Sequence, residues 1–353
     1  MSEPGTLTKV QQRLLHEVLA YRDGMSNDTA ATESGGHRNT SAPDRALQYG
    51  GHHGWRSWLK RPSLGGVLIA VCLAALVFVL VGTRSGSRVL AATPPPLSYH
   101  VDSTQSGRAV LLSLAAVAAR QPVRSRPASG RFAYVKYVGW YLDVRVSGAT
   151  ATSTFAPPIV SEAWTRPDGY GRVIRRRATG GLRVTGSTRG PIVEDFTIPS
   201  KGGHAFPLLR LSTDPTVVAR QLNAGDPPNW REPLVRFDLL YELKLEQPVP
   251  SNVESTILRV LATSPGLINS GTVVDRAGRP GVAVSLDSRD PPGVSGSPRM
   301  RYTLIFSPST GSLLGEEETV IANPGKLDVH RGAVVEYTVY LSSSYVDSGP
   351  TRP

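Results

Sequence analysis

The sequence predicts an α+β protein, with one transmembrane helix followed by an extracellular domain in which an antiparallel β-sheet packs on several helices. Two observations carry this prediction. Residues 64–82 read LGGVLIAVCLAALVFVLVG and contain no charged side chain. Downstream of them, strand patterns come first, a block of helix signals follows, and strand patterns return, which is an order that fits an α+β domain.

The apolar stretch 64–82 has the length of a transmembrane helix. At about 1.5 Å per residue it spans roughly 28 Å, close to the about 30 Å hydrocarbon core of a bilayer. A buried core helix usually shows a polar face, which this stretch lacks. A cleaved signal peptide lies nearer the N-terminus than residue 64. The sequence therefore predicts a lipid bilayer as the partner of residues 64–82, and Cys72, the only cysteine, lies within this span.

The charges that flank the span predict its orientation. Four basic side chains lie within about twenty residues on its N-terminal side, and two lie on its C-terminal side: Arg45, Arg56, Lys60 and Arg61, against Arg84 and Arg88. The positive-inside bias therefore predicts a single-pass protein of the cell membrane with a cytoplasmic N-terminus and an extracellular C-terminal domain.

Residues 1–63 are expected to form the cytoplasmic tail. Apolar residues recur at helical spacing over 8–21, which predicts a short amphipathic helix. The composition of 23–54 is polar and nearly free of aliphatic side chains, so this part is expected to be disordered. Short helices are marginal alone, and residues 8–21 are therefore a candidate binding site for a cytoplasmic regulatory protein. The four histidines of the tail are irregularly spaced and favour a solvated state over a metal site.

Outside the membrane, residues 83–103 are expected to form a stalk, stiffened by three prolines at 94–96. Residues 104–350 are expected to form the extracellular domain. Helices are predicted at 105–120, from the Thr213-Asp214-Pro215 signal, at 234–247, and at 251–263, where Ser251 and Glu254 match a capping box. Strands are predicted at 132–146, at 161–177 with a turn at Pro167-Asp168-Gly169, at 271–287, at 301–321 and up to residue 346.

The stretch 301–321, RYTLIFSPSTGSLLGEEETVI, contains serine, threonine, tyrosine and glutamate, which are residue types found in several kinds of active site. It is nevertheless predicted to be a scaffold hairpin. Tyr302, Leu304 and Phe306 share one face of a strand, and SPSTG has turn chemistry. Glu316 and Glu318 share one face and Glu317 the other, so the three carboxylates do not converge. They are expected at a solvated edge, where Glu317→Gln changes stability little; the alternative is that one or two of them face a cleft.

No catalytic motif is present in the outer portion. It has no G-x-S-x-G elbow, H-E-x-x-H, P-loop or G-x-G-x-x-G sequence, and the spacing of its carboxylates selects no acid–base pair among Asp143, Asp168, Asp275 and Glu316. The sequence therefore predicts a protein that is not an enzyme, without catalytic residues, metal or cofactor.

Residues 64–353 carry 31 basic and 22 acidic side chains, which gives a net charge of +9. Six arginines cluster on strand-like sequence: Arg172, Arg175, Arg176, Arg177, Arg183 and Arg189. This cluster is a candidate site for an anionic partner outside the cell, namely an anionic lipid, a lipoprotein or a wall polymer. The alternative is an arginine-rich edge strand that discourages aggregation. Nucleic acid is not expected as a partner.

Four motifs resemble those of an uncharacterised family of actinobacterial single-pass membrane proteins: GRFAYV from residue 130, STDP from 212, DRAGRPGVAV from 275 and LIFSPSTGSLLGEE from 304. The resemblance covers roughly residues 96–346. It implies a cytoplasmic N-terminus, an exported α+β domain, and a link to signalling, because members often accompany sigma factors of the extracytoplasmic-function class. More distantly, the layout resembles the lipoprotein-carrier fold, which implies a curved antiparallel β-sheet around helices.

Two functions from different classes follow. The first is a binding or sensory domain outside the membrane, with a helix at 8–21 that reports inside. The second is a structural or scaffolding envelope protein with a passive tail; a hydrolase without a recognisable motif comes third. The binding hypothesis predicts an apolar groove between the sheet and the helices at 234–247 and 251–263, with the arginine cluster at its rim. The alternative is that the same side chains close on one another.

Overall fold

The computed structural model of the protein describes residues 90–101, 104–123, 132–147, 150–154, 156–179, 184, 186–198, 211–223, 233–288, 298–324 and 327–349. All of them belong to one compact unit, Leu90–Pro353. The predicted tail at 1–63 with its helix at 8–21, the predicted transmembrane helix at 64–82 and the first part of the predicted stalk lie outside the described residues. None of the helices that the structure describes is long and apolar enough to cross a membrane.

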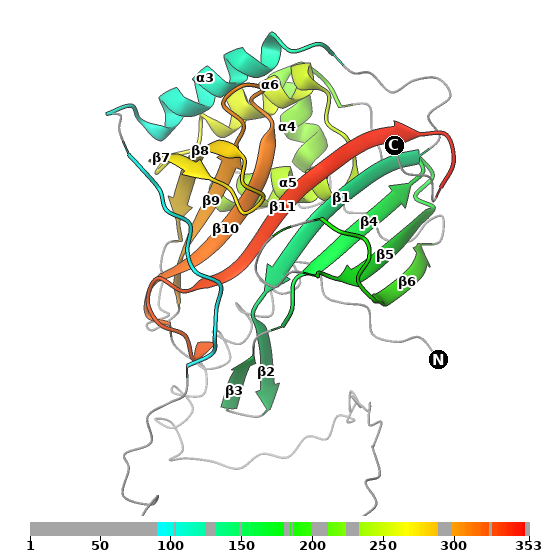
Figure 1. Ribbon diagram of the computed structural model, residues 1–353. Helices are drawn as coiled ribbons and strands as arrows, with labels where there is room; N and C mark the ends of the chain where they lie inside the picture. The colour runs from blue at the N-terminus through cyan, green and yellow to red at the C-terminus, as the bar shows by residue number, and fades with distance from the viewer. Residues whose placement is uncertain are drawn as a thin grey trace, which may run out of the picture. The chain divides into compact units, whose positions relative to one another are not determined.

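The unit is built on one curved, nine-stranded sheet in the order β6-β5-β4-β1-β11-β10-β9-β8-β7, in which every neighbouring pair is antiparallel (Figure 1). Its strands are β1 Phe132–Tyr141, β4 Ile159–Thr165, β5 Gly171–Arg177, β6 Ile192–Ile198, β7 Ile268–Val274, β8 Pro280–Asp287, β9 Arg299–Phe306, β10 Leu313–Ala322 and β11 Val334–Val346. A short hairpin, β2 Asp143–Ser147 with β3 Thr150–Thr154, forms a separate sheet. Because β11 pairs with β1, the strands before and after the helical block join in one sheet, and the predicted α+β fold is confirmed.

Four helices are described: α3 Gly107–Ala119, α4 Pro215–Asn223, α5 Pro233–Glu246 and α6 Ser251–Leu261. The proline signal before α4 is confirmed, since Asp214 accepts hydrogen bonds from the amides of Thr216 and Val217. The capping box predicted for α6 is wrong. Pro250 is the N-cap and makes no side-chain cap bond, because Ser251 donates instead to the carbonyls that follow α3.

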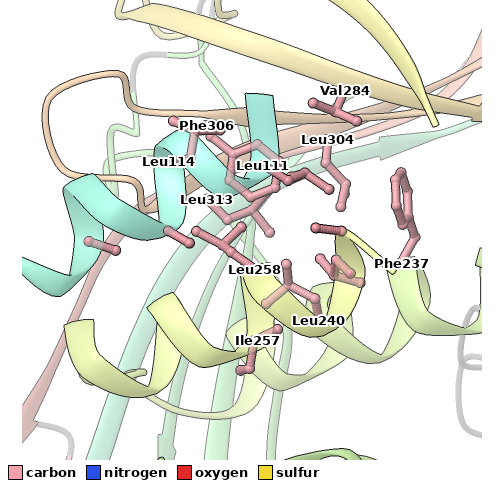
Figure 2. Close-up of a cluster of buried hydrophobic side chains, with 14 of the residues drawn as sticks. Leu111, Leu114, Phe237, Leu240, Ile257, Leu258, Val284, Leu304, Phe306 and Leu313 are labelled. Atoms are coloured by element: carbon pink, nitrogen blue, oxygen red, sulfur yellow. The ribbon is translucent and has the colours of Figure 1, made fainter. Parts of the chain in front are cut away.

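The helices cover one face of the sheet and close a dry core against it. Figure 2 shows the side chains of α3, α5 and α6 pointing into those of the strands. Leu111, Leu258 and Phe306 are fully buried there. The sequence predicts an apolar stripe on α3 that consists of Val110, Leu111, Leu114, Val117 and Ala118. All of these except Val117 belong to the buried core. Helical periodicity therefore places this face correctly.

The other face of the sheet is covered by the chain that precedes α3. Residues 90–101, which we name the strap, run along this face as an extended segment (Figure 1). Leu97 and Tyr99 pack on Val273, Ala283 and Ile305. The strap and the helices thus lie on opposite faces, and the described part of the predicted stalk is in contact with the domain.

The stretch 301–321 forms the β9–β10 hairpin, and its predicted turn is confirmed. Gly311 has φ of 74°, and a Cβ there would lie 2.6 Å from the carbonyl oxygen of Leu114, so only glycine fits this approach to α3. Glu254 of α6 accepts hydrogen bonds from Ser312 Oγ at 2.9 Å and from the Leu313 amide at 3.0 Å. The hairpin is a scaffold element that docks on two helices.

Candidate functional site

The space between the sheet and helices α5 and α6 is filled. Leu240, Leu243, Ile257, Leu258 and Leu261 are each at most 2% exposed and belong to one continuous core cluster. The apolar groove expected at this place is therefore closed by the side chains that were expected to line it. Two concave sites among the described residues lie elsewhere, beside strand β7.

We name these sites together the β7 crevice, because they meet at the outer edge of that strand. The first lobe, of about 250 Å³, lies between α3 and the β7–β8 hairpin. The second lobe, of about 540 Å³, lies between the strap and the same hairpin. Four residues line both lobes: His100, Thr272, Val282 and Pro308. The 540 Å³ lobe falls within the range of small-molecule pockets, roughly 300–1,000 Å³.

The walls of the crevice are mostly apolar. Helix α3 contributes Val110, Leu114 and Val117, and the other walls contribute prolines and valines, together with Leu97. The uncharged polar groups of Gln105, Ser113, Asn269, Thr272 and Ser98 also line it. Such a lining suits the apolar part of a ligand, with a few hydrogen-bonding groups to orient it.

Two glycines bring the walls together. A Cβ on Gly107, the first residue of α3, would lie 2.9 Å from the main-chain carbon of Leu267. Gly271 of β7 has φ of 85°, and a Cβ there would lie 2.0 Å from the carbonyl oxygen of His100. Next to it, His100 and Thr272 exchange both main-chain hydrogen bonds, at 2.9 and 2.8 Å. The strap therefore forms one wall of the crevice through direct main-chain pairing with β7.

A buried ion pair anchors the strap. Glu317 of β10, whose side chain is 1% exposed, pairs with Arg276 of the β7–β8 turn, whose side chain is 6% exposed. Glu317 Oε1 accepts from the hydroxyl of Tyr99 at 3.2 Å and from the amide of Leu97 at 3.4 Å. The expectation that Glu316 and Glu317 lie at a solvated edge is wrong, since both are buried. The reason is that β10 is an inner strand of a sheet that is covered on both faces.

Two tyrosines beside this pair are hard to ionise. Burial is the largest cause that raises the pKa of Tyr99, and the neighbouring carboxylate of Glu317 raises it further. Burial likewise raises the pKa of Tyr337 to about 12, although the positive charge of Arg276 lowers it in part. The guanidinium of Arg276 lies 4.4 Å from the ring centroid of Tyr337, a cation–π contact.

The predicted arginine cluster lies on β5 and the chain that follows it. Arg172 makes a two-point contact with Asp195 of β6, at 2.9 and 2.8 Å, and Arg175 pairs with Glu194 at 2.7 Å. The hydrogen bond from Arg172 holds the pKa of Asp195 below its usual range. Arg176 donates to the carbonyl of Gly190 at 3.4 Å. Carboxylates of the neighbouring strand thus balance part of the charge.

The remaining members of the cluster do not complete one site. Arg177 and Arg189 are exposed, and Arg183 lies outside the described residues. Because neighbours on a strand point to opposite faces, Arg175 and Arg177 lie on one face of β5 and Arg172 and Arg176 on the other. From β5 to β7 the sheet has seven strand steps, or about 34 Å at ~4.8 Å per step. The cluster is therefore not at the rim of the β7 crevice.

The carboxylates considered for acid–base chemistry lie on four separate elements: Asp143 on β2, Asp168 in the β4–β5 turn, Asp275 in the β7–β8 turn and Glu316 on β10. Asp168 and Asp275 accept hydrogen bonds from the amides of their own turns. Within the described ranges, no group of three or more His, Cys, Asp or Glu side chains is placed to hold a metal ion.

Sequence reasoning missed the β7 crevice and the Glu317 network. Gly271 was the available signal, because a glycine inside a strand marks a close backbone approach. Comparisons with protein-family models, with curated proteins and with solved structures gave no match.

Replacing Glu317 tests the buried pair. We expect Glu317→Gln to lower the free energy of unfolding by about 3–5 kcal/mol, because it leaves the buried guanidinium of Arg276 without its counter-charge. Glu194→Gln removes the exposed partner of Arg175 and is the matched control, with an expected loss below about 1 kcal/mol. Denaturant unfolding of both variants measures the difference, and equal losses would contradict the burial of Glu317.

Alkaline titration tests the buried tyrosines. The pKa of Tyr337 is raised to about 12 from an unfolded value of 10, so its contribution to stability is complete below pH 10 and is lost as pH rises through 12. Absorbance at the phenolate band, recorded with circular dichroism, is expected to show late ionisation coupled to unfolding. Tyr337→Phe should remove part of this pH dependence. The phenol oxygen of Tyr337 is buried without a hydrogen-bond partner among the described residues, so the substitution itself costs little.

Proposed function

We propose that this protein is a single-pass, non-enzymatic envelope protein whose Leu90–Pro353 unit is an extracellular binding or sensory domain, with the β7 crevice as its ligand site. The proposal rests on which segments form the walls of the crevice. One wall is the strap, and the strap is the part of the unit nearest in sequence to the apolar stretch 64–82. A ligand in the crevice therefore touches the segment that leads to the membrane.

The chemistry of the crevice favours a ligand with an apolar part. Its described lining is dominated by valine, leucine and proline, with hydroxyl, amide and imidazole groups between them. Burial of an aliphatic chain against such walls is favourable by about 25 cal/mol per Å² of apolar surface. The acyl part of a lipid or of a lipoprotein fits this description better than a wall polymer does.

Sensing follows from the position of the strap. The docked strap presents Pro96, Leu97, Ser98 and His100 to the crevice. A ligand that contacts them therefore binds the protein with the strap docked and the protein with the strap displaced with different free energies. Such a ligand shifts the equilibrium between the two states. The predicted helix at 8–21 then reports the change to a cytoplasmic regulatory protein, in line with the resemblance to companions of sigma factors.

A scaffolding role is the second candidate, and the arginines of β5 favour it. Arg172 and Arg175 are paired with carboxylates of β6, the strand at the sheet edge. Paired charges along an edge discourage the addition of another strand. A domain with this edge and with a filled core under α5 and α6 can serve as a rigid spacer whose tail is passive.

A topology experiment tests the membrane assignment. A reporter fused after Pro353 is expected to be active outside the cytoplasm, because the flanking charges place the C-terminal side of the span there. Protease added to intact protoplasts is expected to remove the outer domain and to spare the tail. Digestion of the tail with protection of the domain would reverse the orientation.

Filling the crevice tests the ligand site. Ser113 lies in the first lobe on α3, and Ser113→Trp is expected to weaken the binding of a fluorescent fatty acid at least tenfold by occupying that lobe. Leu112→Trp is the matched control, because Leu112 is 39% exposed on the same helix and does not line the crevice. Saturable binding that Ser113→Trp leaves unchanged would exclude the first lobe, and absence of binding to the wild-type protein would favour the scaffold.

A further inference from the structure

The sheet holds the strap chiefly through its main chain. Arg276 Nη2 donates to the carbonyl of Pro95 at 3.0 Å, and Glu317 accepts from the amide of Leu97. Three residues after Leu97, His100 exchanges main-chain hydrogen bonds with Thr272. The guanidinium binds a main-chain carbonyl, and the carboxylate binds the main-chain amide two residues later. Such contacts recognise an extended backbone whatever its side chains, as strand addition to a sheet edge does.

Side chains add a pattern to this recognition. The half-buried Leu97 and Tyr99 alternate with the exposed Ser98 and His100, as neighbours in an extended chain do. Leu97 and Tyr99 contact an apolar floor of Val273, Ala283 and Ile305, and the Tyr99 hydroxyl donates to Glu317 at 3.2 Å. The groove therefore selects a leucine followed two residues later by a tyrosine.

The groove stays intact without the strap. Arg276 and Glu317 both belong to the sheet and its turns, and they pair with each other directly. Arg276 also stacks on Tyr337, which stacks on Trp140 with ring centroids 6.1 Å apart. Departure of the strap hydrates this pair but leaves neither charge without its partner, so the cost of opening is lower than that of breaking a buried ion pair.

The strap is held by separate hydrogen bonds and not by a continuous strand ladder. It forms no helix or strand, only the isolated bridge of His100 with Thr272. The Ala91 amide donates to the Asp328 carbonyl at 2.8 Å, whereas the bonds of the strap to Glu317 are long, at 3.4 and 3.2 Å. Leu90 and Val101, at its two ends, are 47% and 61% exposed. Segments with few buried apolar contacts open with small free energies.

We propose that the groove formed by Arg276, Glu317 and Thr272 is a binding site for an extended peptide of the pattern Leu-x-Tyr, which the chain's own strap occupies in cis. A segment of this pattern on another polypeptide displaces the strap and takes over its contacts. This site differs from the β7 crevice in its ligand, and it does not depend on the proposed lipid ligand.

The test uses the full chain in neutral detergent and a labelled peptide with the sequence of residues 94–101, PPPLSYHV. In the wild-type protein the strap competes at a millimolar effective concentration. A strap variant, Leu97→Ser with Tyr99→Phe, weakens the competitor, because it loses the Leu97 side chain and the Tyr99 hydroxyl, and it changes no residue of the groove. Fluorescence anisotropy is expected to show at least tenfold tighter binding of the peptide to the strap variant than to the wild type.

Two further changes test the pattern and the site. The peptide with its own Tyr99→Phe change is expected to bind at least tenfold more weakly, because it lacks the hydroxyl that Glu317 accepts. Thr272→Pro in the strap variant removes the amide that pairs with the strap carbonyl and is expected to weaken binding similarly. Absence of saturable binding to the folded strap variant, or equal binding of both peptides, overturns the proposal.

Hydrogen exchange on the wild-type protein gives a second measurement, which does not require the strap variant to fold. An excess of the peptide is expected to accelerate exchange at the amides of Leu97 and His100, because the displaced strap loses both hydrogen bonds. Helix α3 is the internal control, and its amides are expected to exchange at an unchanged rate. Unchanged exchange in the strap at saturating peptide contradicts displacement.

Discussion

The buried pair of Glu317 and Arg276 is the interaction on which the arrangement of this domain depends. Removing a carboxylate and a guanidinium from water costs several kcal/mol for each ion, and only good geometry with additional hydrogen bonds offsets that cost. Here the β7–β8 turn supplies Arg276, β10 supplies Glu317, and the strap supplies the Tyr99 hydroxyl and two main-chain groups. Three segments that are far apart in the sequence therefore contribute to this site: two supply the charges, and the strap adds hydrogen bonds to both of them. The ring of Tyr337 packs against Arg276 and completes the site.

Coverage of the sheet on both faces explains where free space remains. Helices α3, α5 and α6 fill one face, and the strap with the loop around Val329 covers much of the other. An antiparallel sheet with two covered faces has an apolar interior on both sides, so its open space lies where coverage ends. That place is the edge strand β7, where α3 leaves the sheet and the strap meets it at only one bridge. The crevice is thus a consequence of edge geometry.

Local patterns in the sequence predicted local structure well. They failed where contacts with residues distant in the sequence determine whether a side chain is buried or paired. The β9–β10 turn, the proline at the start of α4 and the apolar stripe of α3 depend on neighbours within a few residues, and the structure has all three. The burial of Glu317 depends on Arg276, 41 residues earlier, and on Tyr99, 218 residues earlier. A run of three glutamates carries no sign of either partner. The carboxylates that pair with Arg172 and Arg175 come from β6, whose register with β5 includes a shift beside Arg175 that no local rule specifies.

The two proposed sites share the strap, and the proposal therefore predicts that binding at one site weakens binding at the other. Leu97 and His100 line the second lobe of the crevice and also make the main-chain contacts of the groove. A crevice ligand that contacts the docked strap stabilises the docked state, and a peptide that takes the groove requires the displaced state. Each ligand therefore weakens the binding of the other by the same factor, because coupling between two sites is reciprocal. In this scheme, displacement frees the chain that precedes α3, whereas occupancy of the crevice holds it, so the two proposed ligands favour opposite states of the strap.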